Sequence, residues 1–323
     1  MKNKIWAYLI HLSNHMWEDE LSSPRGLYVP NQYTENNGTE IEIWDDTVKY
    51  LAECKYTHVL VDVGDAIKYE THPEISAPDA WDKDFTKKKL DEIRALGMTP
   101  VPKLNFSACH DTWLKEYSRM LSTKKYYEVA SDVIREVAEL FGSPELFHIG
   151  FDEEVAEYQS NYGIVTVRNG DLWWHDLNYV AKECEKWGAR PWIWSDYAWD
   201  KKEIFKKNMS KSILQSNWFY MNFMDVTEED LKNLHVQYKA IPTYLQLNEW
   251  GYDQVPTAST WDTGYTDNPY QTVAFGRDRL EGDHLLGYMT APWMPTKDEA
   301  KHQLKNDAYK LYLARKKIYP ETL

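Results

Sequence analysis

The sequence has few cysteines and no regular cysteine pattern. Its three cysteines, Cys54, Cys109 and Cys184, are odd in number and widely spaced. A disulfide framework needs paired cysteines and a metal knuckle needs closely spaced ones, so neither is expected. Cysteine usage of this kind is typical of a reducing compartment, and we therefore expect the cytoplasm.

Long apolar runs and basic clusters are also missing. Lys2 and Lys4 precede an apolar run of only residues 5–10, which is too short for a secretory signal or a membrane span. A secreted chain trimmed of its signal would have the same pattern. The 37 basic residues are outnumbered by 51 acidic ones, and the net charge is −14. Because no basic stripe is present, we expect neither nucleic acid nor an anionic membrane as a partner.

Aromatic residues, in contrast, are abundant. The 323 residues include 15 Trp and 23 Tyr. Core packing alone favours aliphatic residues and Phe, whereas Trp and Tyr combine a flat apolar face with a polar group. Such side chains suit stacking on the C–H faces of sugars, so the composition points to a carbohydrate ligand.

Strand-like apolar runs alternate with amphipathic helical runs along the chain. The predicted strands are residues 5–12, 58–63, 99–105, 146–151, 191–194, 213–218, 243–247 and 285–289. The predicted helices are residues 44–55, 87–96, 126–141, 172–187, 201–207, 228–237, 270–280 and 297–318. Strict alternation favours a parallel sheet, and eight repeats favour its closure into a (β/α)8 TIM barrel. An open doubly wound sheet would need a glycine-rich first turn, and residues 11–14 contain no glycine. We therefore predict a single barrel domain over residues 1–323.

The fourth predicted strand ends in a row of acids. Residues 145–154 read ELFHIGFDEE, in which an apolar run stops at Asp152, Glu153 and Glu154. Barrel enzymes place their chemistry at the carboxyl ends of the strands, and paired carboxylates are the usual groups for cleaving a glycosidic bond. We predict that Asp152 and Glu153 are catalytic and that Glu154 is solvated.

The residues that follow the predicted strands are mostly acids, amides, histidines and tryptophans. The predicted substrate-binding residues are His11, Asp65, Asn105, His110, Trp194, Asp196, Trp218, Glu249, Trp250 and Trp293. Carboxylates and amides hold hydroxyl groups, and Trp stacks on a sugar ring. A phosphate site would need glycine-rich loops and cations, and Lys103 is the only obvious cation near these strand ends. A sugar therefore fits better than a nucleotide, and we expect no metal or other cofactor.

The acidic stretch also carries a family resemblance. Residues 148–153, His-Ile-Gly-Phe-Asp-Glu, resemble the His-x-Gly-Gly-Asp-Glu motif of the family-20 glycoside hydrolases, the β-N-acetylhexosaminidases. In that family the motif closes the fourth strand of a (β/α)8 barrel, and Trp194 and Trp293 fall where the family places pocket tryptophans. The resemblance implies that Asp152 orients the 2-acetamido group of the substrate and that Glu153 is the general acid and then the base. It also implies that the acetamido oxygen is the nucleophile, with net retention.

The chain departs from the family pattern at three points. Phe151 replaces the second glycine of the motif. The family's substrate-binding arginine at the end of strand one has no counterpart in residues 5–14, and Arg25 in the following loop is the candidate substitute. The domain that usually precedes the barrel is not expected, because the first predicted strand begins close to Met1. The fold and the role of Glu153 depend less on these features than the N-acetylhexosamine specificity does.

Two other readings remain open. Many retaining barrel glycosidases carry the acid/base after strand four and a glutamate nucleophile after strand seven, the places of Glu153 and Glu249. Direct double displacement needs these carboxyl groups about 5–5.5 Å apart. Asp152 would then either support the catalytic residues or bind a sugar hydroxyl. The other reading is a carbohydrate-binding barrel without catalysis, which the missing arginine favours.

Overall fold

The fold is a nearly closed (β/α)8 barrel, as predicted. The computed structural model describes residues 4–15, 36–159, 164–261, 263–280 and 282–323; Arg25 lies outside these ranges. Eight strands form one sheet in the order β6-β5-β4-β3-β2-β1-β8-β7. Parallel bridges from Gln215 to Gln254 and from Trp218 to Thr257 join the β6 end of this order to the β7 end.

The strands are short and the helices lie between them in sequence. The strands are β1 (Ile5–His11), β2 (His58–Asp62), β3 (Thr99–Lys103), β4 (Leu146–Gly150), β5 (Arg190–Trp194), β6 (Leu214–Ser216), β7 (Thr257–Ala258) and β8 (Gly287–Thr290). The helices are α1 (Ile41–Glu53), α2 (Lys83–Ala95), α3 (Lys124–Leu140), α4 (Asp171–Lys186), α5 (Tyr197–Asp200), α6 (Lys202–Asn208), α7 (Ala240–Glu249), α8 (Asn268–Arg279) and α9 (Lys301–Ile318). In the described part of the chain, no helix has both the length and the apolar character needed to cross a membrane.

Residue contacts group the chain into two compact units. The first unit comprises Met1–Ile10, Ile41–Val59 and Trp194–Leu323, and the second comprises His11–Glu40 and Leu60–Ile193. The predicted acid pair belongs to the second unit, and all the predicted tryptophans belong to the first.

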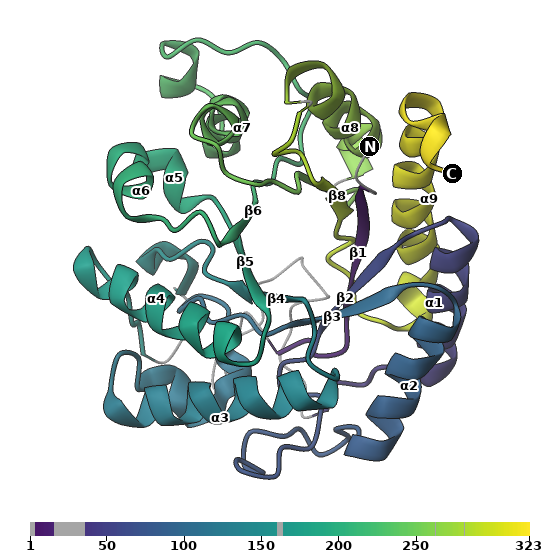
Figure 1. The fold of residues 1–323 in the computed structure, drawn as a ribbon, viewed down its shortest axis with the longest axis vertical. Helices are drawn as coiled ribbons and strands as arrows, with labels where there is room; N and C mark the ends of the chain where they lie inside the picture. The colour runs from purple at the N-terminus through teal and green to yellow at the C-terminus, as the bar shows by residue number, and fades with distance from the viewer. Residues whose placement is uncertain (1–3, 16–35, 160–163, 262, 281) are drawn as a thin grey trace. The chain divides into compact units, whose positions relative to one another are not determined.

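In the second unit, α3 and α4 pack side by side (Figure 1). Thr123 caps α3 because its side chain accepts the N–H of Tyr126. From there Val129, Val133 and Val137 recur on one buried face of the helix. β4 is buried from its second residue onward, as expected for a strand of a parallel sheet covered by helices. The carboxyl end of β4 therefore emerges from a closely packed, buried strand.

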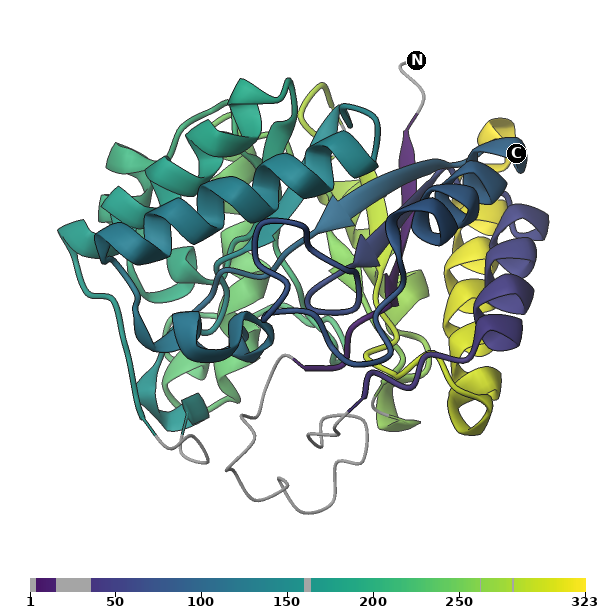
Figure 2. The same cartoon turned by 90° about the horizontal axis from the view of Figure 1, so that it is seen from below.

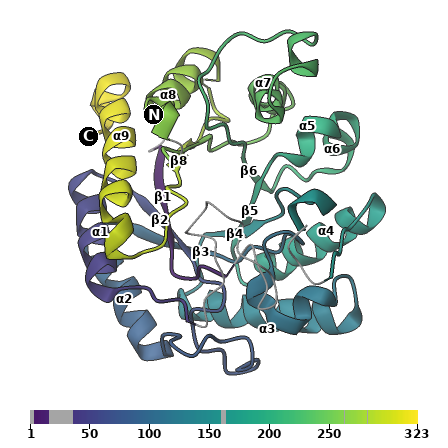
Figure 3. The same cartoon turned by 180° about the vertical axis from the view of Figure 1, so that it is seen from behind.

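In the first unit, α1 and α9 lie side by side (Figure 2), as do α8 and α9 (Figure 3). The Tyr8 hydroxyl of β1 donates to the Leu304 carbonyl of α9 over 2.9 Å. Trp6 of β1 stacks on Tyr288 of β8 with 5.2 Å between ring centroids. These contacts fix β1 against β8 and α9.

The predicted seventh strand is wrong. Residues 243–247 lie inside α7, whose buried residues Ala240, Ile241, Thr243, Tyr244 and Leu247 recur at helical spacing. The seventh strand is instead the two-residue β7. The predicted helix 228–237 is also wrong, because this segment contains only the 3-10 turns Asp230–Lys232 and Val236–Lys239. The other predicted strands and helices are confirmed, with ends shifted by a few residues.

Candidate active site

The chain turns sharply after β4. Gly150, Phe151 and Glu153 all have positive φ, at +77°, +68° and +53°. Glycine is required at the first position because a Cβ there would lie 1.8 Å from Asn105 Oδ1. The left-handed region is uncommon for the other two residue types, and such strained residues cluster at functional sites.

The histidine of the motif shapes this turn from within the strand. His148 is fully buried, and its Nδ1 accepts the Gly150 N–H over 3.2 Å. Burial, with the nearby charge of Lys103, holds the pKa of His148 well below its ordinary value. A neutral imidazole can accept this bond, so His148 supports the backbone of the acid pair.

The acid pair shares one imidazole. His110 Nε2 lies 3.3 Å from Asp152 Oδ2 and 3.1 Å from Glu153 Oε2. The Asn105 side-chain amide donates to Asp152 Oδ1 over 2.9 Å, and the Ser107 hydroxyl donates to the Asp152 carbonyl. The structure thus brings together four residues that the sequence singled out, and it directs His110 at the acids.

The two carboxyl groups differ in exposure. The Asp152 side chain is 11% exposed and the Glu153 side chain is 26% exposed. Burial raises the pKa of Asp152, and the charge of Glu153 raises it further. Burial alone would lower the pKa of His110, but the charges of Asp152 and Glu153 and a hydrogen bond with Glu153 outweigh it and raise the pKa above its ordinary value. His110 therefore keeps its proton to higher pH than an ordinary histidine, and that proton lies between the two acids.

The same three residues are the ones that could hold a metal. Among the described residues, the ligand atoms of His110, Asp152 and Glu153 all lie within 4.8 Å of one another. Zn²⁺ binds imidazole nitrogen and carboxylate oxygen at about 2.0–2.2 Å. A metal there would displace the Nε2 proton of His110, so protonation and metal binding are alternatives at this position.

Two predicted ligands, His11 and Asp65, are held in buried ion pairs. Asp62 lies 3.1 Å from His11 Nδ1 and accepts a 2.7 Å bond from Lys103 Nζ. Burial would raise the pKa of Asp62, but Lys103 and His11 outweigh it and lower the pKa. Asp65 is paired with His15 at 2.6 Å and with Lys115 at 2.9 Å. Contact of His11 or Asp65 with substrate stays a prediction.

Four predicted ligands gather in the first unit. The rings of Trp194 and Trp293 are 5.8 Å apart, and Trp218 Nε1 donates to Asp196 Oδ1 over 3.3 Å. Tyr220 connects the two contacts, because its ring lies 5.2 Å from that of Trp218 and 6.3 Å from that of Trp293.

Tyr220 and Trp199, which both contact Trp218, were not among the residues predicted from the sequence. The Trp199 ring lies 4.5 Å from that of Trp218, and Trp199 Nε1 donates to Asn217 Oδ1 over 2.8 Å. Both residues follow predicted ligands by two or three positions in the sequence. Their closeness to Asp196 and Trp218 along the chain was the available signal.

Glu249 and Trp250 do not follow a strand, contrary to prediction. Glu249 is the last residue of α7 and is exposed, and Trp250 caps that helix. The Trp250 ring lies 5.6 Å from Lys206 Nζ, and its carbonyl accepts a bond from Lys211. Since α7 leads into β7, these residues precede the strand and lie on the side of its amino end. The double-displacement reading therefore loses the strand-end nucleophile on which it depended.

The side chain of Glu154, predicted to be solvated, is buried. It is only 4% exposed and forms an ion pair with Arg168, whose side chain is 1% exposed. Arg168 is thus a further cation near the strand ends, besides Lys103 and Lys115. It lies in the irregular segment before α4, and the sequence analysis did not predict its burial.

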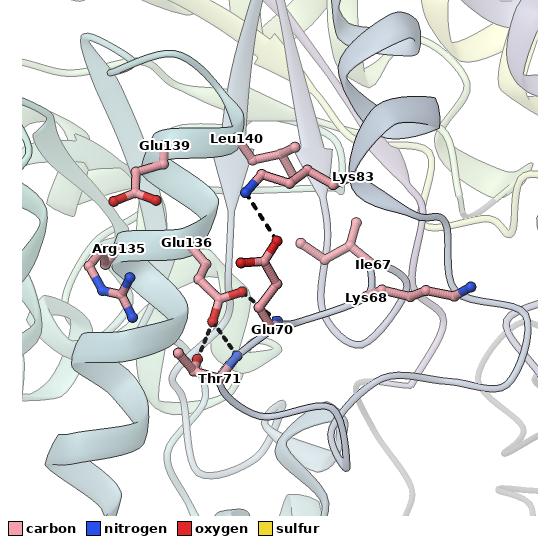
Figure 4. Close-up of a pocket in the computed structure, with 9 residues that line it drawn as sticks. All are labelled: Ile67, Lys68, Glu70, Thr71, Lys83, Arg135, Glu136, Glu139 and Leu140. Atoms are coloured by element: carbon pink, nitrogen blue, oxygen red, sulfur yellow. Dashed lines mark hydrogen bonds and ion pairs between the residues drawn. The ribbon is translucent and has the colours of Figure 1, made fainter.

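The second unit also contains a solvent-open hollow of about 440 Å³ (Figure 4). Its lining residues are Ile67, Lys68, Glu70, Thr71, Lys83, Arg135, Glu136, Glu139 and Leu140. Glu136 accepts the backbone N–H groups of Glu70 and Thr71 over 2.7 and 2.8 Å. No predicted site residue is among the lining residues, and the bonds of Glu136 anchor the loop after β2 to α3.

Comparison with known proteins gives matches only among solved structures. No model of a known protein family matches the chain, and no curated protein matches it. A Flavobacterium johnsoniae chitobiase matches with a TM-score of 0.63 at 15% identity, over 90% of this chain and 50% of that one. Dispersin B matches with 0.59 at 11%, over 96% and 98%. An exo-β-N-acetylglucosaminidase of Vibrio harveyi matches with 0.59 at 13%, over 99% and 58%.

The chain has a barrel fold like that of the family-20 enzymes among these structures. It spans about half the length of the chitobiase and 58% of the Vibrio harveyi enzyme, but 98% of dispersin B. At these identities the likeness extends to the fold of the family-20 barrel. Any statement about chemistry therefore rests on the side chains of this chain itself, above all on Asp152, Glu153 and His110.

Proposed function

We propose that this chain is a glycoside hydrolase that cleaves β-N-acetylhexosaminides with retention. The observation that carries the proposal is the position of His110 Nε2, within 3.3 Å of Asp152 and 3.1 Å of Glu153. The family-20-type fold supports it, since two of the similar structures are described as a chitobiase and an exo-β-N-acetylglucosaminidase.

Glu153 is assigned the proton transfers because it is the more exposed acid. Its carboxyl group donates a proton to the glycosidic oxygen while the bond from C1 to that oxygen breaks. The acetamido carbonyl oxygen attacks C1 and closes an oxazolinium ring. The Glu153 carboxylate then takes a proton from water, whose oxygen attacks C1 and releases the acetamido oxygen.

Asp152 is assigned to the acetamido nitrogen. Asn105 holds one of its oxygens, and the mechanism requires the carboxylate to accept the N–H that becomes positively charged in the ring. Protonated His110 supports the two acids electrostatically. We also assign sugar contacts to Trp194, Asp196, Trp218 and Trp293, because aromatic faces and a carboxylate suit a pyranose.

The test is hydrolysis of an aryl β-N-acetylglucosaminide, with the aryl β-glucoside as matched control. We expect cleavage only of the sugar that carries the 2-acetamido group, and inhibition by an oxazoline-mimicking thiazoline. Cleavage of both sugars at equal rates would remove the acetamido group from the mechanism. Sugar binding by calorimetry, without turnover across a panel of aryl glycosides, would indicate a binding barrel.

A further inference from the structure

Arg168 connects the loop after β3 with the loop after β4. Its Nη2 donates to the Phe106 carbonyl over 2.6 Å, one residue after Asn105. Its Nε donates to Glu154 Oε2 over 3.1 Å, and Nη2 also binds Glu154 Oε1. Its Cζ lies 4.7 Å from the ring centroid of Phe151. The guanidinium therefore touches the residue before Asp152 and the residue after Glu153.

The same guanidinium is fixed from behind by α4. Arg168 Nη1 donates to Asp176 Oδ2 over 3.3 Å, and Asp176 is itself held by the hydroxyl groups of Ser122 and Tyr127, over 2.7 and 2.5 Å. Glu154 Oε1 also accepts the Ala108 N–H over 3.1 Å. All of these groups belong to the second unit.

We propose that Arg168 is a positioning residue that holds Asp152 and Glu153 against Asn105 and His110. The proposal rests on the function proposed above. Because the guanidinium is planar and has five donors, it can bind two carboxylates and a carbonyl while its face stacks on a ring. Phe151, where the chain departs from the family motif, supplies that ring. A displacement of about 1 Å in a catalytic group can cost about 100-fold in rate. Loss of the Arg168 contacts is therefore expected to lower kcat.

The test compares Arg168→Met with the wild type and with Arg315→Met. Arg315, in the first unit, is a matched control because it is also buried, donates to the Lys55 carbonyl and lies 4.9 Å from the Trp6 ring. We expect kcat on the aryl β-N-acetylglucosaminide to fall about 100-fold in Arg168→Met, with little change in KM. Arg315→Met keeps the wild-type kcat.

A second readout does not need activity. The NMR titration of the His110 imidazole, assigned by its loss in His110→Asn, reports how close the two acids remain. Since Asp152 and Glu153 raise the pKa of His110, we expect that pKa to fall in Arg168→Met and to stay unchanged in Arg315→Met. A wild-type protein without glycosidase activity would overturn the proposed function. The His110 titration would still test whether Arg168 holds Asp152 and Glu153 near His110.

Arg168→Lys covers the case in which Arg168→Met does not fold. Lysine keeps the charge but cannot make the forked contacts, so we expect a kcat and a His110 pKa between those of the wild type and Arg168→Met. A folded Arg168→Met or Arg168→Lys with both the wild-type kcat and the wild-type His110 titration would overturn the proposal.

Discussion

Glu153 and Glu249 both end an apolar stretch of the chain, but their surroundings differ. Glu153 lies in a left-handed turn, 3.1 Å from His110 and beside a buried aspartate. Glu249 lies at the exposed end of α7, and the next residue caps the helix. A carboxyl group becomes useful for proton transfer when its neighbours fix its position and its proton. The two glutamates therefore differ in the contacts around their carboxyl groups.

The largest effect is expected from Glu153→Gln. The amide has nearly the same shape as the acid, but in the proposed mechanism it cannot donate the proton that the leaving oxygen needs. General acid–base catalysis contributes about 100- to 10,000-fold, and we expect kcat on the aryl β-N-acetylglucosaminide to fall within that range. The folded state is checked by near-UV circular dichroism. Retention of more than a tenth of the wild-type kcat would assign the proton transfer to another group.

Gly150→Ala tests the turn that places the acid pair. The left-handed conformation costs a residue with a Cβ about 1–2 kcal/mol, and overlap with Asn105 adds about 1–3 kcal/mol. We expect the free energy of unfolding in urea to fall by about 2–5 kcal/mol. Gly188 is the matched control, since it has φ +82° but open space around a Cβ. Gly188→Ala therefore carries only the conformational cost of about 1–2 kcal/mol, and equal losses in both variants would contradict the close approach to Asn105.

Two buried aspartates extend the comparison to stability. In the second unit, Lys103 and His11 lower the pKa of Asp62. In the first unit, burial raises the pKa of Asp307 to about 6, even though Thr260 and Thr290 donate hydrogen bonds to it. The two groups must therefore give the free energy of unfolding opposite dependences on pH.

Asp307→Asn tests whether ionisation of Asp307 destabilises the fold. The unfolded pKa of Asp is about 3.9, so ionisation of Asp307 between about pH 4 and pH 6 reduces the free energy of unfolding by about 3 kcal/mol. We expect the stability of Asp307→Asn relative to wild type to rise by about that amount from pH 4 to pH 7, as measured by urea unfolding. For Asp62→Asn the relative stability moves the other way. The contribution of Asp62 is present above the unfolded pKa and is lost as the pH falls through the lower folded value. A common sign in both variants would refute these assignments.

Patterns within a few residues were sufficient to predict most of the barrel. Apolar runs located β1–β6 and β8. The row of acids after β4 singled out Asp152 and Glu153, whose catalytic role stays a prediction. Both signals depend on neighbours in the chain, which a sequence displays directly. The seventh repeat failed because Thr243 and Tyr244 have side chains typical of strands, while their burial follows the helical spacing of α7. The two residues of β7 are too few to form a pattern.

The contacts that hold the site together could not be predicted in this way. Arg168 reaches Glu154 and Phe106 across 14 and 62 residues of chain. His110 reaches Glu153 across 43 residues. His110 was predicted to bind the sugar, which stays a prediction, and its contacts with Asp152 and Glu153 were not predicted. Buried ion pairs depend on which loops meet in space, and a charged residue in an irregular segment looks the same whether it is buried or solvated.

The smallest effect is expected from Glu249→Gln, which makes the same isosteric change as Glu153→Gln. Glu249 is exposed at the end of α7, and exposed substitutions of this kind change stability by less than about 0.5 kcal/mol. We expect kcat and KM on the aryl β-N-acetylglucosaminide to stay within about twofold of wild type, since a twofold change corresponds to about 0.4 kcal/mol. Trapping with a 2-fluoro glycoside sharpens the comparison, because a covalent adduct on Glu249 would restore the double-displacement mechanism. An intact chain mass after that treatment, together with thiazoline inhibition, would leave the substrate's acetamido oxygen as the nucleophile.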